Sequence, residues 1–269
     1  MDELSQSRPE YSICITRYNN GQTVRRSLES ILNQIDNDFE VIVVDSESTD
    51  GSYEILKEFS DVGKIKLIRQ NCSRGKGREI AFENSSGKYI IANTDMDDIF
   101  KPRLRELLAR YQAVAAGRLL WASSRIKGAF GGGESFTIAP RELIAELGGW
   151  KDLQIFKDLE LRSRAARRGK YRRGEFALLE ATNPHAERTR TRIARMKWRY
   201  VRYREILRIG LPMGLWNRRE TRKQKLIKAC MKVSVLPFYQ SYADPFNYDS
   251  DSNNPRYPVG PLDLEEVKK

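Results

Sequence analysis

The sequence is short of cysteine and of long apolar runs, and each shortage excludes a class of protein. Its 269 residues include three cysteines, Cys14, Cys72 and Cys230, which are far apart and show no metal-binding spacing. An odd and sparse set favours a reducing compartment and argues against a disulfide framework. No stretch of 18 apolar residues occurs, so no membrane-spanning helix is expected. The first residues have no basic and apolar segments of a signal peptide, and we therefore expect a cytoplasmic protein.

Two phosphate-binding signatures are also missing. Neither G-x-G-x-x-G nor G-x-x-x-x-G-K-[ST] occurs, which leaves dinucleotide and P-loop binding unsupported. We find no internal repeats. The length suits one large domain, or one domain with an appendage, and a chain of this size buries roughly 70–75% of the surface of its unfolded form.

Positive charge is abundant and unevenly distributed. The whole chain carries a net charge of +12, with 48 Lys and Arg against 36 Asp and Glu. Residues 186–232 hold 16 of the basic side chains and three acidic ones, a net charge of +13, so the rest of the chain has a net charge of −1. The basicity therefore belongs to a C-terminal appendage and not to the main domain.

Strand-like and helix-like segments alternate through the first hundred residues. Apolar, β-branched runs predict buried strands at 11–17, 39–45, 64–70 and 88–94. Apolar residues at helical spacing predict helices between them, at 23–34, 52–59 and 78–87. The alternation predicts an α/β fold with a mostly parallel, doubly wound sheet. We expect Ser48 or Thr49 to cap the second helix, and the glycine-containing stretch 71–77 to be a loop.

The pattern is looser after residue 100. Helices are predicted at 101–117, with Pro102 near the start, at 140–150, closed by Gly148 and Gly149, and at 151–169. Residues 121–128 and the run from 171 predict strands. Residues 190–236 predict basic amphipathic helices, and residues 237–269, rich in Pro, Asn and Asp, predict an irregular tail.

Charged residues gather where the predicted strands end. Ligands of open α/β sheets bind outside the carboxyl ends of the strands. Asp45 ends the second strand, the basic loop with Lys76 and Arg78 follows the third, and the stretch NTDMDDIF, with Asp95 and Asp97, follows the fourth. Carboxylates are preferred ligands of Mg²⁺ and Mn²⁺, and basic side chains balance phosphate charge. The set therefore predicts a site for a nucleotide diphosphate and a divalent cation.

Five blocks in this order resemble the inverting glycosyltransferases of family 2, which have the GT-A fold. The resemblance covers roughly residues 10–185. The blocks are SICITRYNN, VVDSESTDGS, NCSRGKGREIAFENSSGKYI, DMDD and GGWKDLQIFKDLELRSRAARRG. Thr16, Glu79 and Lys157 depart from the family pattern, where proline, asparagine and glutamate are usual. No block is specific alone, but five in order at element boundaries are specific together.

The resemblance implies a nucleotide-sugar donor and a divalent cation. Asp45 would hydrogen-bond the base, with Tyr18 lining the base pocket. Lys76 and Arg78 would face the nucleotide. A UDP- or GDP-sugar is the implied donor, and Mn²⁺ or Mg²⁺ the implied ion.

The resemblance also implies the metal ligands and the catalytic base. Asp95 and Asp97 would bracket the ribose, diphosphate and metal, with Asp97 as the direct ligand. His185, the sole histidine, would approach the diphosphate or metal. Asp158 takes the position of the base that removes the proton of an acceptor hydroxyl, and a positioned carboxylate contributes typically 10²–10⁴-fold to such a rate.

Structural roles compete with each of these assignments. The DMDD stretch could be a turn that caps a helix, Asp45 could only support a turn, and the basic loop could be solvated. Asp158 and Glu160 could be ion-pair partners of Arg162 and Arg164 on one helix. His185 could be an ordinary surface residue.

The basic appendage favours an anionic partner. Basic helices with interspersed aromatic residues often lie on anionic membrane surfaces, and many family 2 enzymes act on lipid-linked or polysaccharide acceptors. Nucleic acid is disfavoured because no recognised motif supports it.

The predicted organisation is a glycosyltransferase domain at 8–189, a basic helical extension at 190–236 and a tail at 237–269. The rival reading is a catalytically silent GT-A-like module that binds anionic polymer or membrane. A nucleotidyltransferase is disfavoured because its glycine-rich loop is absent.

Overall fold

The computed structural model describes residues 8–94, 96, 98–123, 135–182, 200–201, 204–205 and 262–264. The strands are β1 (Tyr11–Arg17), β2 (Phe39–Asp45), β3 (Lys66–Arg69), β4 (Tyr89–Ala92), β5 (Asp98–Phe100), β6 (Leu119–Ser123), β7 (Ser135–Pro140), β8 (Tyr171–Glu175), β9 (Leu179–Thr182) and β10 (Leu262–Asp263). The helices are α1 (Val24–Leu32), α2 (Ser52–Asp61), α3 (Arg74–Glu83), α4 (Leu104–Ala115), α5 (Arg141–Glu146) and α6 (Lys157–Arg167).

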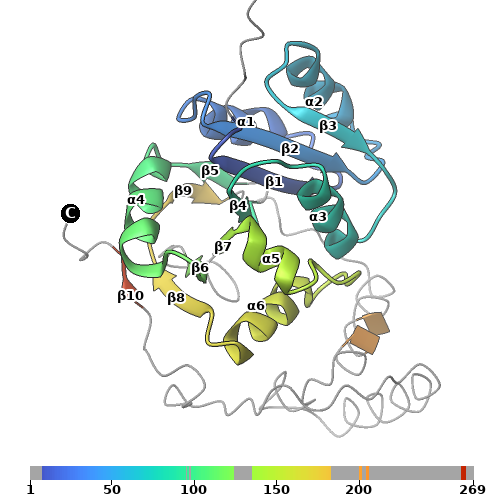
Figure 1. Cartoon of the computed structure of the whole chain (residues 1–269). Coiled ribbons are helices and arrows are strands. Elements are labelled where there is room, and N and C mark those ends of the chain that lie inside the picture. The colour runs from blue at the N-terminus through green and yellow to red at the C-terminus, as the bar shows by residue number, and fades with distance from the viewer. Residues whose placement is uncertain are drawn as a thin grey trace, which may run out of the picture.

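An eight-stranded sheet forms the body of the molecule (Figure 1). Its strand order is β10-β8-β6-β7-β4-β1-β2-β3, and β5 pairs with β9 in a separate small sheet. Strand β1 runs parallel to both β2 and β4, and β2 runs parallel to β3. Strand β7 is antiparallel to its neighbours β4 and β6. The sheet is thus mostly parallel, as the sequence predicts.

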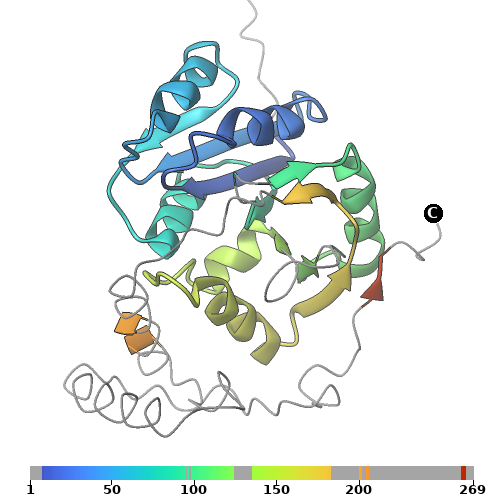
Figure 2. The same cartoon turned by 180° about the vertical axis from the view of Figure 1, so that it is seen from behind.

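Alternating side chains of the strands build two cores, one on each face of the sheet. Ile13 and Ile15 of β1 pack with apolar residues of α1, α2 and α4. Cys14, which points the other way, packs with residues of α3, α5 and α6. Helix α3 lies nearer the viewer in Figure 1 and α1 in Figure 2. This two-sided burial confirms the doubly wound arrangement and explains why the central strands are apolar throughout.

Three local predictions are wrong at their boundaries. Residues 74–77 are the first turn of α3 and not a loop, because the Ser73 hydroxyl caps that helix by accepting from the backbone N–H of Lys76 at 3.1 Å. Helix α2 begins after Gly51, so neither Ser48 nor Thr49 caps it. Helix α6 begins at Lys157 and not at 151.

Part of the predicted irregular tail joins the sheet. Strand β10 pairs in parallel with Gly174 and Glu175 of β8, and the Leu264 side chain after it is fully buried in the core. A Cβ atom at Gly174 would come within 2.8 Å of Leu264 Cδ1, so a larger residue there would force the leucine side chain to shift. Residues 262–264 are therefore a structural part of the domain.

Replacing Leu264 with alanine should destabilise the whole domain. Truncating a buried leucine to alanine leaves a cavity and lowers the free energy of unfolding by about 2–5 kcal/mol. The matched control is Val62→Ala, because Val62 is 69% exposed, and we expect a change within about 0.5 kcal/mol there. Chemical denaturation measures both. Equal stability of the two variants would show that the tail does not pack on β8 in solution.

Candidate functional site

Hydrogen bonds join the turns that follow β1 and β2. The backbone N–H of Asn19 donates to the Ser48 hydroxyl at 3.0 Å, and the Thr49 N–H donates to the Asn19 side-chain oxygen at 3.0 Å. The Gly21 N–H donates to an Asp50 carboxylate oxygen at 2.8 Å. The residues of the YNN and STDG motifs thus hold two neighbouring strand ends together, and they define one side of a rim.

Three residues that are not glycine adopt positive φ angles at this rim. They are Asn19 (52°), Glu47 (56°) and Asn93 (73°), and they follow β1, β2 and β4 respectively. Such angles are uncommon, although asparagine tolerates them better than most residues. Strained backbone of this kind tends to gather at functional sites, and here it marks the carboxyl end of the sheet.

Asp45 is fully buried at the end of β2. Its carboxylate accepts the Ser48 N–H at 2.9 Å and the Ser48 hydroxyl at 2.6 Å. Arg17 lies opposite on β1, with its Nε 3.8 Å from Asp45 Oδ1. Burial lowers the pKa of Arg17, while the charges of Asp45 and Asp50 oppose the shift. Asp45 therefore supports the turn, as the structural alternative expects, and its contact with a base stays a prediction.

Tyr18, the predicted neighbour of the base, is exposed. It lies on the turn after β1, and 51% of its surface is accessible, more than for any other large aromatic side chain in the described part of the chain. An exposed ring beside the strand ends is available for stacking on a planar ligand. Lys76 is half-buried in the first turn of α3, on the same rim.

A buried ion pair between Arg78 of α3 and Asp158 of α6 forms the centre of the site. Arg78 Nη1 lies 2.6 Å from each Asp158 oxygen, and Nη2 donates to the side-chain oxygen of Asn93. Lys157 Nζ lies 3.0 Å from Asp158 Oδ2, and the Trp150 indole N–H donates to Oδ1 at 3.3 Å. The structure thus brings the predicted base to the predicted basic residue at the carboxyl end of β4.

The charges around Asp158 keep its carboxyl ionised. Burial would raise the pKa of this group, but the positive charges of Arg78, Lys157 and Arg162 outweigh burial and hold the pKa well below its usual range. Glu160, by contrast, pairs with Arg164 at 2.6 Å on the same helix. Glu160 thus has an ion-pair partner within its own helix, as the structural alternative expects, whereas Asp158 pairs with Arg78 of α3 and with Lys157.

Close packing of backbone fixes α3 against the segment before α6. A Cβ at Gly75 would lie 2.1 Å from the Lys151 carbonyl oxygen, and one at Gly149, where φ is 61°, would lie 2.2 Å from Glu79 Oε1. The Glu79 carboxylate accepts the Trp150 N–H at 2.6 Å. Glu79, a departure from the family pattern, therefore holds the GGW turn in place.

The predicted metal ligands Asp95, Asp97 and His185 lie outside the described residues. Their described neighbours show where the DMDD stretch runs: Met96 is buried, its carbonyl accepts the Thr23 hydroxyl at 2.8 Å, and Asp98 is buried in β5. Within the described ranges no three His, Cys, Asp or Glu side chains are close enough to hold a metal ion. The metal prediction thus rests on Asp95 and Asp97, whose hard oxygen donors suit Mg²⁺ or Mn²⁺.

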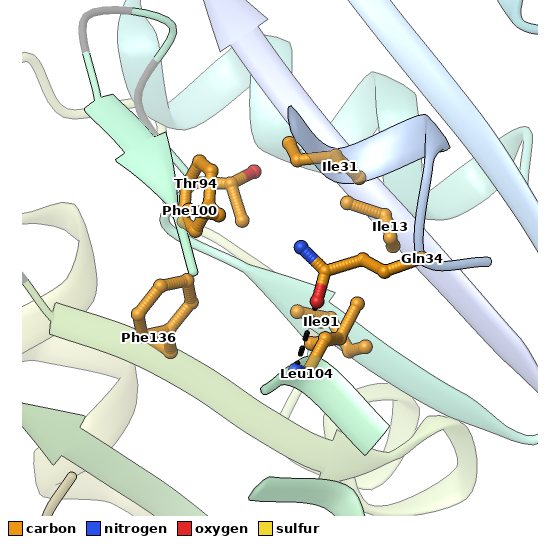
Figure 3. Close-up of a pocket in the computed structure, with 8 residues that line it drawn as sticks. All are labelled: Ile13, Ile31, Gln34, Ile91, Thr94, Phe100, Leu104 and Phe136. Atoms are coloured by element: carbon orange, nitrogen blue, oxygen red, sulfur yellow. Dashed lines mark hydrogen bonds between the residues drawn. The ribbon is translucent and has the colours of Figure 1, made fainter. Parts of the chain in front are cut away.

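An apolar pocket lies behind this stretch, inside the core (Figure 3). Its lining residues are Ile13, Ile31, Gln34, Ile91, Thr94, Phe100, Leu104 and Phe136. Gln34 accepts the backbone N–H of Leu104 at 2.9 Å, so its amide belongs to a helix start and is not a free ligand group. The pocket belongs to the core with α1 and α4, and Asp158 lies on the other face.

Sequence reasoning missed two residues of the site. Asn93 was read only as the end of a strand, although asparagine after a buried strand is a signal for a left-handed turn. Glu205 was read as part of a basic extension. It is buried, with 1% of its surface exposed, and contacts the segment before α6. Its one sequence signal is that it is among only three acids in residues 186–232.

Comparison with solved structures identifies the fold. A mannosyltransferase of Pyrobaculum calidifontis superposes with a TM-score of 0.58 over 85% of this chain and 69% of that one, at 18% identity. The fold is therefore the GT-A fold of glycosyltransferases.

Comparison of sequences finds similarity to glycosyltransferases in the N-terminal part of the chain. The family described as "Glycosyl transferase family 2" matches residues 12–123. EpsE of Bacillus subtilis, named as a glycosyltransferase, is 32% identical over 46% of this chain and 48% of its own length. The succinoglycan biosynthesis protein ExoO of Rhizobium meliloti is 32% identical over 40% of this chain and 31% of its own length. Residues 12–123 are thus similar to the family 2 glycosyltransferases, and the matches span about half or less of the length of these relatives.

The described helices include none that is both long enough and apolar enough to cross a membrane.

The depressed pKa of Asp158 predicts a specific acid sensitivity. Because its native-state pKa lies below the unfolded value of about 3.9, the ionised carboxylate stabilises the fold above that pH. This contribution is lost as the pH falls from about 4 through the native-state pKa. Asp158→Asn should lower the unfolding free energy by about 3–5 kcal/mol at neutral pH, because it leaves Arg78 and Lys157 without their partner. As the pH falls below about 4, the unfolding free energy of the variant should also decrease less steeply than that of wild type.

Denaturation curves collected between neutral and acidic pH test this expectation. Asp61→Asn is the matched control, since Asp61 pairs with Lys57 on the surface and such pairs contribute only about 0–1 kcal/mol. The same acid slope in wild type and Asp158→Asn would contradict the assignment.

Proposed function

We propose that this protein is a metal-dependent, inverting glycosyltransferase that moves a hexosyl group from a nucleotide-diphosphate sugar to an acceptor hydroxyl. The observation that carries the proposal is the position of Asp158. It is an ionised carboxylate at the start of α6, on the face of the sheet that holds α3, and it is linked through Arg78 to Asn93 at the carboxyl end of β4. That edge is where ligands of open α/β sheets bind.

The donor would lie along the rim between the ends of β1 and β4. Tyr18 is exposed and can contact the base. Asp45 lies at the end of the neighbouring strand β2, where its carboxylate accepts the Ser48 hydroxyl. Lys76 and Arg78, both on the first turns of α3, offer positive charge to the diphosphate. The Pyrobaculum mannosyltransferase of the same fold was solved with GDP-mannose and Mn²⁺, which supports a nucleotide sugar as the donor.

Asp97 and Asp95 would hold a divalent cation, with His185 as a further candidate ligand. When bound, such an ion stabilises negative charge on a departing diphosphate. Between them in the sequence, the Met96 carbonyl accepts the Thr23 hydroxyl at 2.8 Å. The Mn²⁺ in the structure of the Pyrobaculum mannosyltransferase supports a divalent ion of this kind.

Asp158 would act as the base. As the acceptor oxygen bonds to C1 of the sugar, the bond from C1 to the diphosphate oxygen breaks and the hydroxyl proton passes to Asp158. Attack from the face opposite the leaving group inverts the anomeric centre. The carboxylate is ionised before the acceptor arrives because Arg78 and Lys157 lower its pKa. The ExoO relative, named for succinoglycan biosynthesis, supports a glycan acceptor.

The basic segment 186–232 would bring the enzyme to its acceptor. Its net charge of +13 suits an anionic surface, such as the cytoplasmic face of a membrane, where each basic residue contributes about 1 kcal/mol of attraction. Apart from residues 200–201 and 204–205, this segment lies outside the described part of the chain.

One observation favours the rival function of a catalytically silent module. Two cations, Arg78 and Lys157, contact Asp158 directly, and a strongly paired carboxylate is a weak base. A silent module would bind anionic polymer or membrane through its basic segment and show no transfer. The two experiments below separate the two functions.

Donor binding should raise the melting temperature of wild type in a metal-dependent way. At 100 times its dissociation constant a ligand stabilises the folded state by about 2.7 kcal/mol, which for a domain of this size is a rise of roughly 5–10 °C. UDP- and GDP-sugars are each tested with Mn²⁺. Asp97→Ala should abolish the rise, whereas Asp61→Ala, which removes an exposed carboxylate of α2, should keep it. No rise in wild type with any donor would favour the silent module.

Asp158→Asn should keep donor binding and lose transfer by about 10²-fold or more. Binding is measured by equilibrium dialysis below the melting midpoint, because the substitution also costs stability. Turnover is measured as Mn²⁺-dependent hydrolysis of the donor and as transfer to glycan acceptors. Glu160→Gln, two residues along α6, is the matched control and should transfer at close to the wild-type rate. Normal transfer by Asp158→Asn would refute the assignment of the base.

A further inference from the structure

Glu205, in the basic segment, binds the backbone directly before α6. Its carboxylate accepts the N–H groups of three consecutive residues: Gln154, Ile155 at 2.8 Å and Phe156 at 3.2 Å. Residues 204–205 are helical and are drawn in orange beside this segment in Figure 1. The contact joins parts of the chain that are about fifty residues apart.

The burial of Glu205 requires this contact. Only 1% of its surface is exposed, and a buried carboxylate is costly unless hydrogen bonds satisfy it. Consecutive backbone N–H groups form a concave anion site, and the positive end of the α6 dipole adds to the attraction. Hydrogen bonds to an ionised acceptor are stronger than neutral ones. The three N–H groups and the carboxylate therefore satisfy one another.

The segment that Glu205 holds leads directly to the proposed base. Phe156 is the residue before α6, and Asp158 lies in the first turn of that helix. On its other side the same segment is fixed to α3, because Gln154 Oε1 accepts the Arg74 N–H at 3.1 Å and the Leu153 carbonyl accepts the Gly75 N–H at 2.9 Å. Glu205 is thus the second of two anchors that set where α6 begins.

We propose that Glu205 is a positioning residue for Asp158. Through the N–H groups of residues 154–156 it fixes the start of α6, and so the alignment of the Asp158 carboxylate with Arg78 and with an acceptor hydroxyl. The inference rests on the proposed function for its kinetic consequence. Its structural part, that Glu205 binds the backbone before α6, does not depend on that function.

Hydrogen exchange and kinetics of Glu205→Ala test the proposal. The backbone N–H groups of residues 154–156 should be protected from exchange in wild type and lose protection in the variant. Turnover of the donor in Mn²⁺-dependent hydrolysis should fall about tenfold, because small misplacements of catalytic groups cost one to two orders of magnitude. The KM for the donor should change less than about twofold, since Glu205 does not touch the proposed donor groups. Added formate should restore part of the turnover by occupying the vacated anion site.

Two further variants keep the test decisive. Glu142→Ala removes an equally charged but exposed side chain of α5 and should match wild type in exchange and turnover. Glu205→Gln keeps the shape of the side chain but not its charge, and it replaces the alanine variant in the test if that variant folds poorly. Its exchange protection and its turnover should lie between those of wild type and those of Glu205→Ala. Unchanged exchange at residues 154–156, or unchanged turnover without a formate effect, would overturn the proposal. If wild type itself neither binds nor turns over any donor, the proposed function fails, and the exchange data still decide whether Glu205 docks as described.

Discussion

The site depends on one buried ion pair, Arg78 with Asp158. Two charges removed from water are stable only if their geometry is good and their other hydrogen bonds are met. Here Arg78 also bonds to Asn93, and Asp158 also meets Lys157 and Trp150, so both groups are satisfied. The pair therefore fixes α3 relative to α6, and it fixes both relative to the end of β4. A shift of either helix would leave a buried charge without its partner. The relative position of α3 and α6 is therefore fixed and cannot change by small steps.

The packing around the pair explains why so many glycines and polar contacts lie nearby. Gly75 and Gly77 let α3 approach the chain so closely that an added Cβ would lie 2.1 Å from a neighbouring atom. Glu79 on the same helix holds the turn before Trp150, and Glu205 holds the next segment. Gly75 and Glu79 of α3, together with the distant Glu205, thus place the segment that leads into α6. The excess of positive charge that remains around Asp158 also suits a ligand with two phosphate groups.

Much of this architecture was predictable, and the exceptions have physical causes. The alternation of apolar strands and amphipathic helices sets the fold, and the sequence pattern places Asp45 and Arg78 at one rim, whereas Asp158 was indicated only by the family resemblance. The first turn of α3 was missed because two glycines there read as a loop, although packing against residues 151–153 and Thr16 makes them helical. The pairing of Arg78 with Asp158 links residues 80 positions apart, and local patterns contain no information on such a contact. Glu205 was missed for the same reason.

The two edges of the large sheet are protected in different ways. An unpaired edge strand offers free N–H and C=O groups to other chains and so promotes aggregation. At one edge β3 is short and exposes the charged side chains of Lys66 and Arg69, which discourage such pairing. At the other edge, the pairing of β10 with β8 and the insertion of Leu264 beside Gly174 cover β8. Proteolytic removal of residues 262–264 would therefore leave β8 as an unpaired edge strand and open a cavity in the core. We expect the cleaved protein to self-associate through β8 before it unfolds.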